Sequence, residues 1–160
     1  MESPTAQIET LLPHRPPMLL IDTIVEQDEG RIVATRTFHR DEFFVQGHFP
    51  GHPIVPGVVL CECALQAGAA LVGSLTSPPE ATTADKRLPV VTRIDGVKFK
   101  QQVHPGQTVV IEARLTERLS DAFFLTGKIS LDGKLAARLD FACTFVRAEV
   151  STEDEHRGSG

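Results

Sequence analysis

The run VVLCECALQAGAALVGSL, residues 58–75, decides the fold of this 160-residue chain. Its apolar side chains cover nearly the whole circumference of a helix, and a helix that is apolar on all sides is buried on all sides. Glu62 and Gln66 interrupt the run, and its length of about 18 residues is at the lower limit for a membrane span. We therefore expect a long helix in the core of a soluble domain.

Apolar runs on both sides of this helix predict strands. The predicted strands cover 18–26, 31–38, 90–100, 108–119, 122–131 and 134–146, with a turn of helix at 8–12 and loops at 47–57 and 76–89. A curved antiparallel sheet wrapped around one long buried central helix accounts for this pattern, because each element then buries the apolar surface of the other. The fold class is α+β, and the free edges of such a sheet favour pairing with a second chain.

The composition is that of an ordinary soluble protein. The formal net charge of −5 argues against binding to nucleic acid. We expect a single domain over 1–147, followed by an acidic and disordered tail over 148–160. The N-terminal stretch has no signal pattern, which favours the cytoplasm and no membrane attachment. The three cysteines, Cys61, Cys63 and Cys143, are expected to be buried reduced thiols.

The loop before the helix, GHFPGHPIVPG at 47–57, is the first candidate for chemistry. Its prolines fix φ and remove N–H donors, so the loop is stiff and holds His48 in one place relative to the helix. Gly57 at the helix start lets a ligand approach the free backbone N–H groups closely. A carbonyl oxygen that gains charge during proton abstraction would be stabilised there.

A carboxylate in the apolar helix is the second candidate. Glu62 and Gln66 are four residues apart, hence on one face of the helix. From the residues alone, two interpretations stay open. Gln66 satisfies Glu62 in a polar stripe at a subunit interface, or it orients a carboxylate that donates a proton. With His48 on the adjoining loop, the second interpretation gives an acid/base site.

The other histidines have simpler interpretations. His52 follows His48 by four residues, but the prolines around them exclude helical geometry, so no metal site is expected. His14 is interpreted as a structural or entrance residue, and His39 and His104 as solvated side chains.

Several motifs together resemble the beta-hydroxyacyl-acyl carrier protein dehydratases of the FabA/FabZ family over residues 8–146. The motifs are Leu11-Leu12-Pro13-His14-Arg15, Leu19-Leu20-Ile21-Asp22, Gly47-His48-Phe49-Pro50-Gly51, Pro56-Gly57-Val58, Glu62 with Gln66, Phe99-Lys100 and Val103-His104-Pro105-Gly106. The resemblance implies the hot-dog fold and homodimers with shared active sites, which in this family generally assemble into hexamers as trimers of dimers. The isomerising FabA branch typically has Asp where this chain has Glu62, so the FabZ-type branch is favoured.

The resemblance also implies a function, that of a (3R)-3-hydroxyacyl-[acyl carrier protein] dehydratase of fatty acid biosynthesis that needs no cofactor. His48 of one subunit would take the C2 proton of the thioester. Glu62 of the other subunit would help protonate the leaving hydroxyl, and the product would be a trans-2-enoyl thioester. The implied substrate-binding residues are Gly57, Val58, Gln66 and Phe49.

Two other functions are compatible with an acyl-thioester fold. A hot-dog acyl-thioester hydrolase would use Glu62 to activate water, and a regulatory module would bind the thioester without turnover. The presence of both His48 and Glu62 speaks against these alternatives. Lys98, Lys100 and Arg93 are candidates for contacts with an acidic carrier protein.

Overall fold

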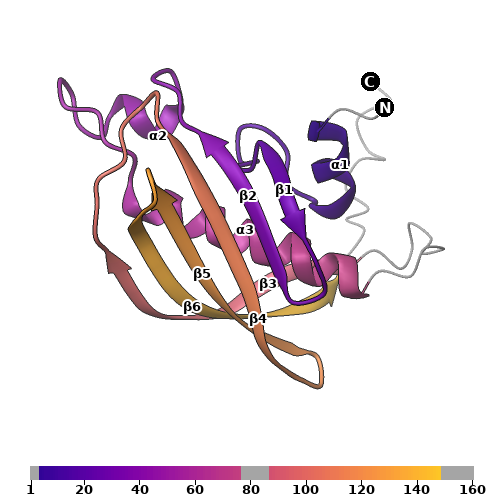
Figure 1. Cartoon of the computed structure of the whole chain (residues 1–160). Helices are drawn as coiled ribbons and strands as arrows, with labels where there is room; N and C mark the ends of the chain where they lie inside the picture. The colour runs from indigo at the N-terminus through magenta and orange to yellow at the C-terminus, as the bar shows by residue number, and fades with distance from the viewer. Residues whose placement is uncertain (1–3, 77–86, 149–160) are drawn as a thin grey trace, which may run out of the picture.

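The computed structural model describes residues 4–76 and 87–148. Its helices are α1 (Pro4–Leu11), α2 (Phe43–Gln46) and α3 (Gly57–Thr76), and its strands are β1 (Thr23–Gln27), β2 (Arg31–Thr37), β3 (Arg87–Phe99), β4 (Thr108–Leu119), β5 (Ala122–Leu131) and β6 (Lys134–Arg147). The strands form one antiparallel sheet in the order β1-β2-β4-β5-β6-β3. Figure 1 shows that this sheet curves around α3.

The predicted α+β architecture, a curved sheet around one long central helix, is confirmed. The core cluster joins the apolar side of α3 to the inner face of the sheet. Close packing depends on small residues: Gly68 of α3 faces Phe141 of β6, and Gly127 of β5 faces Ala64 of α3.

α3 meets the length and hydropathy criteria of a membrane span, with a mean hydropathy of 1.7 over its most apolar window, of which 61% is buried inside the protein. Core helices share that composition, and the sheet covers most of this one. The expectation that the helix is buried on all sides is wrong for its first turn, where Val58 is 74% exposed.

The strand predicted at 18–26 begins later than expected, because β1 covers only its second half. The backbone before β1 bonds to α3 instead of to a neighbouring strand. The side chain of Gln66 accepts the N–H of Leu20 at 2.9 Å and donates to the carbonyl oxygen of Met18 at 2.7 Å. These bonds connect the segment to the helix, and a sequence pattern based on strands does not reveal them.

One other boundary and one short helix differ from the prediction. β3 begins at Arg87 and includes Pro89, which lies within the loop predicted at 76–89. Proline lacks an N–H, so it is tolerated on an edge strand, and β3 is an edge of the sheet. The four-residue helix α2 was missed, because a single turn is too short to show a helical period. Most of the loop predicted at 76–89 and of the tail at 148–160 lies outside the described residues.

Candidate active site

The loop between α2 and α3 contains a tight turn that the sequence encodes directly. Phe49 and His52 exchange backbone hydrogen bonds of 3.0 and 2.9 Å. Between them Pro50 supplies the fixed φ of position i+1 and Gly51 has a φ of +78°, as a type II turn requires. The turn therefore confines the backbone immediately after His48.

His48 is held at both its backbone and its ring. Its carbonyl oxygen accepts the N–H of Ile54 at 2.8 Å, and its Nδ1 lies 2.9 Å from the carbonyl oxygen of Ile54. A carbonyl oxygen only accepts, so Nδ1 carries the hydrogen and Nε2 of the neutral ring keeps its lone pair. The imidazole is thus oriented as a general base that acts through Nε2.

The loop is also tied to the connection between β3 and β4. The N–H of Val55 donates to the carbonyl oxygen of Val103 at 2.8 Å, and Nδ1 of His104 lies 3.1 Å from the carbonyl oxygen of Pro53. His104 is exposed, as predicted. The sequence did not reveal that its ring also contacts the loop that carries His48.

Glu62 lies on the first half of α3 and is oriented by Gln66, as the spacing predicts. Nε2 of Gln66 donates to Oε1 of Glu62 at 2.9 Å. Gln66 is only 1% exposed, and its amide also bonds the backbone of Leu20 and Met18. Its polar atoms are used within the chain, so the role that its contacts support is orientation of Glu62. The carboxylate itself is partly open, with 28% of its side chain exposed.

His14 is the residue whose place at this site the sequence reasoning missed. Its Nε2 lies 3.6 Å from Oε1 of Glu62. It belongs to the segment between α1 and β1, which Gln66 ties to α3. The proximity of His14 to Glu62 in space depends on those long-range bonds. The signal in the sequence was the run Pro13-His14-Arg15, but nothing in it pointed to Glu62.

The start of α3 differs from the expectation in one respect. The space next to Gly57 is occupied by Phe99 from the end of β3, because a Cβ built on Gly57 would lie 2.7 Å from the ring carbon Cε1. The absence of a side chain at Gly57 thus accommodates Phe99, which is itself 52% exposed. The N–H groups of Gly57 and Val58 have no acceptor in the described part of the chain. They remain available to an oxyanion.

Among the predicted substrate-binding residues, Val58 and Phe49 are open to solvent. Phe49 is 55% exposed and stacks on the His48 ring, with the ring centroids 4.3 Å apart. No hydrogen bond or ion pair joins His48 to Glu62 among the residues that the structure describes in this chain. The hypothesis pairs these two residues across subunits, so it stays a prediction.

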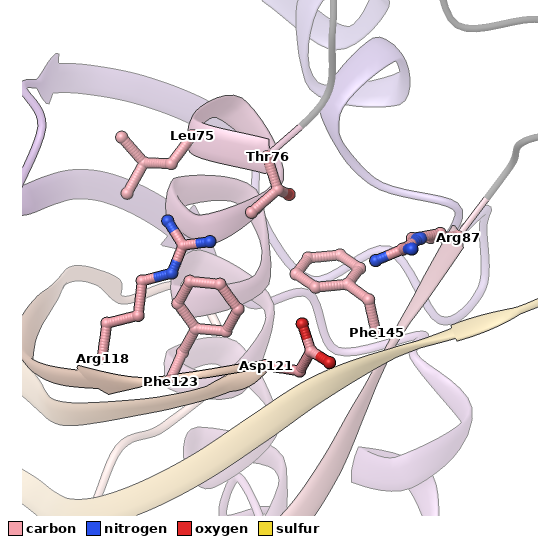
Figure 2. A pocket seen from close by; sticks show the side chains of 7 residues that line it. All are labelled: Leu75, Thr76, Arg87, Arg118, Asp121, Phe123 and Phe145. Atoms are coloured by element: carbon pink, nitrogen blue, oxygen red, sulfur yellow. The ribbon is translucent and has the colours of Figure 1, made fainter.

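One surface pocket lies far from these residues. It has a volume of about 230 Å³ and is lined by Leu75, Thr76, Arg87, Arg118, Asp121, Phe123 and Phe145 (Figure 2). Leu75 is on the last turns of α3, about 20 Å along the helix from Glu62 at 1.5 Å per residue. The pocket is therefore separate from the candidate active site. No cluster that could hold a metal ion is present in the described ranges.

The comparisons with known proteins agree on the family. The model of the FabA-like domain matches residues 12–140, which include every residue of the candidate site. The chain belongs to the FabA-like family. Two relatives of this FabA-like protein carry the name 3-hydroxyacyl-[acyl-carrier-protein] dehydratase FabZ. The one from Anaeromyxobacter sp. strain K is 37% identical over 135 residues, which cover 84% of this chain and 85% of the relative. The one from Koribacter versatilis is 38% identical over 148 residues, 92% of each chain.

A solved structure gives the same fold for this FabA-like chain. The dehydratase heterocomplex ApeI:P from Xenorhabdus doucetiae has a TM-score of 0.73 at 18% identity and covers 89% of this chain and 91% of the other. At that identity the likeness concerns the fold alone. The hot-dog fold that the motifs imply is confirmed.

Proposed function

We propose that this chain is a (3R)-3-hydroxyacyl-[acyl carrier protein] dehydratase, a hydro-lyase that forms a trans-2-enoyl thioester in fatty acid biosynthesis. The observation that carries the proposal is the presence of an oriented base and an oriented acid in one chain of the FabA-like family. His48 has Nδ1 engaged and Nε2 free, and Glu62 is held by Gln66. Relatives at 37 and 38% identity over most of the chain carry the dehydratase name.

The geometry suggests a role for each group. Nε2 of His48 takes the C2 proton, and the electron pair of that C–H bond forms the C2–C3 double bond. The C3–O bond breaks and Glu62 supplies the proton with which the hydroxyl leaves as water. The free N–H of Gly57 stabilises the thioester oxygen as it gains charge, assisted by the positive end of the α3 dipole.

We propose that the working unit is a homodimer joined through β3. This strand is an edge of the sheet, and it exposes a row of large apolar residues that a soluble monomer would not leave uncovered. The exposed residues are Val90, Val91, Ile94, Val97 and Phe99. Phe99 also contacts Gly57, so the edge strand leads directly to the start of α3. In the dimer His48 faces Glu62 of the partner subunit, and the dimers assemble further into a hexamer.

The carrier protein would bind at the basic end of the same strand. Lys98 and Lys100 are exposed and have no carboxylate partner within the described ranges, whereas Arg93 is paired with Asp95. Two exposed cations on either side of Phe99, which contacts Gly57, suit an acidic partner. We place the protein in the cytoplasm, where Cys61, Cys63 and Cys143 stay reduced.

The test follows the reverse reaction. Purified protein is mixed with a trans-2-enoyl thioester of acyl carrier protein, and the absorbance of the conjugated enoyl group is recorded while free thiol is measured in parallel. Loss of absorbance without thiol release is expected, and His48→Ala should slow it about 10²- to 10⁴-fold. Thiol release would make the protein a hydrolase. Binding without either change would make it a regulatory module.

A further inference from the structure

We propose that His14 is a positioning residue that fixes which oxygen of Glu62 faces the substrate. The inference rests on the proposed function, since it concerns how the acid of that reaction is held. It requires that His14 is itself held, that its ring presents a donor to Glu62, and that the two oxygens of Glu62 become unequal.

The backbone around His14 is fixed by its neighbour. Nη1 of Arg15 donates to the carbonyl oxygens of Leu12 at 2.8 Å and of His14 at 2.7 Å. Arg15 also reaches the carbonyl oxygen of Glu9 in α1 at 3.2 Å. The guanidinium thereby connects α1 to the segment that carries His14, and this segment has little freedom to move the imidazole away from α3.

The ring of His14 presents a hydrogen to Glu62. Its Nδ1 is buried and has no hydrogen-bond partner among the described residues. A buried N–H without an acceptor is rarer and costlier than a buried lone pair, so the favoured tautomer carries the hydrogen on Nε2. Nε2 lies 3.6 Å from Oε1 of Glu62, longer than a hydrogen bond, and contacts of this kind at catalytic sites commonly tighten when substrate binds.

The two carboxylate oxygens of Glu62 are therefore not equivalent. Oε1 accepts the amide N–H of Gln66 at 2.9 Å and also faces His14. Oε2 has no hydrogen bond to any described residue of this chain. Because Oε1 accepts the hydrogen bond of Gln66 and faces the ring of His14, Oε2 is the oxygen left to carry the exchangeable proton toward the leaving hydroxyl. Gln66 alone leaves the carboxylate free to rotate about its last bond, and a second donor at Oε1 restrains it.

Two substitutions of the same chemical class test this role. The amide nitrogen of a glutamine occupies about the place of Nε2 of histidine, whereas that of an asparagine occupies about the place of Nδ1. His14→Gln keeps a donor toward Glu62 and should retain kcat. His14→Asn removes it and should lower kcat about 10- to 100-fold with KM little changed, since misplacement of a reacting group acts on the chemical step. His39→Gln, at an exposed histidine of this chain, is the control for loss of an imidazole.

The dependence on Glu62 separates this proposal from the proposed function. In a Glu62→Gln background, His14→Asn should cause no further loss of kcat, because the group that it positions is gone. If the wild type hydrates the enoyl thioester and Glu62→Gln does so measurably but about 10²- to 10⁴-fold more slowly, the proposed function stands. If under those conditions His14→Asn has the wild-type kcat, or His14→Gln is as slow as His14→Asn, the positioning role is wrong. Thermal melting of each variant shows whether a loss of rate comes from unfolding.

Discussion

Gln66 connects Glu62 to the backbone of a segment more than forty residues earlier in the chain, through one buried amide. Its Nε2 donates to Oε1 of Glu62 at 2.9 Å and to the carbonyl oxygen of Met18 at 2.7 Å, while its Oε1 accepts the N–H of Leu20 at 2.9 Å. A single side chain therefore supports both the fold of the N-terminal segment and the orientation of the candidate acid.

This relationship predicts that Gln66→Met is costly although it conserves size. The N–H of Leu20 would lose its partner in the core, and the partly buried carbonyl group of Met18 would lose its partner as well. Each unsatisfied buried group costs about 1 to 3 kcal/mol. We expect the free energy of unfolding, measured with urea, to fall by about 2 to 4 kcal/mol. The matched control is Gln27→Met, which removes an exposed hydrogen bond to Ser74. It should change stability by less than about 0.5 kcal/mol. Equal losses of stability in Gln66→Met and Gln27→Met would contradict the structural role of the Gln66 hydrogen bonds.

The contact between α3 and β6 gives a second prediction. A Cβ on Gly68 would lie 2.5 Å from Cζ of Phe141 and 3.1 Å from Cδ2 of Leu125, both of which are buried. Alanine favours a helix over glycine by about 1 kcal/mol. Overpacking a core costs about 1 to 3 kcal/mol, so Gly68→Ala should be destabilising on balance.

The control for Gly68→Ala is the same change beside a smaller neighbour. In a Phe141→Leu background the new methyl group has space, and Gly68→Ala should cost less than it does in the wild type. Urea unfolding of the wild type, the two single variants and the double variant gives the coupling free energy between Gly68→Ala and Phe141→Leu. A higher unfolding midpoint for Gly68→Ala alone would show that the helix is not pressed against Phe141.

The three cysteines give a third prediction, from burial. All are buried, and burial raises the pKa of the Cys143 thiol to about 11 and also raises the pKa of the Cys61 and Cys63 thiols. The thiolate is the reactive form, so at about pH 8 the folded protein should react slowly with iodoacetamide. The rate at Cys143 should rise with pH up to about 11. Mass spectrometry should find three alkylated sites after denaturation in guanidinium chloride, and rapid alkylation of the folded protein would contradict the burial.

The sequence alone predicted the central helix, most strands and the contact between Gln66 and Glu62, because these depend on local periods and short spacings. It missed α2, since a single turn has no period. It also placed the start of β1 too early, because the bonds of Gln66 to the preceding backbone link residues that are far apart in sequence.

At the candidate site, too, the sequence predicts local geometry but not contacts between distant residues. The position of His48 follows from Pro50 and Gly51 in one turn, which a reader of the sequence can recognise. The position of His14 beside Glu62 follows from tertiary contacts between α1, α3 and the segment before β1, which no spacing reveals. The contact of Phe99 with Gly57 is equally non-local. The ring of Phe99 fills the space beside Gly57 through which the sequence predicts that a ligand approaches.

The exposed edge strand gives the last prediction. If β3 joins two chains, the apolar side chain of Ile94, which is 44% exposed in the single chain, becomes buried between them. In a two-fold interface a charge at that position is buried without a partner and can face its own copy. We therefore expect Ile94→Glu to dissociate the dimer into folded monomers, as measured by sedimentation equilibrium and circular dichroism.

The matched control for Ile94→Glu lies on the opposite edge of the same sheet. Val25 of β1 is 57% exposed and also belongs to an edge strand, so Val25→Glu should leave the dimer contact through β3 intact. Loss of enoyl hydration in Ile94→Glu, together with its retention in Val25→Glu, is expected if His48 acts with Glu62 of the partner subunit. A folded Ile94→Glu monomer with the wild-type rate would refute a shared site. An Ile94→Glu protein with the wild-type mass would exclude β3 as the contact between chains.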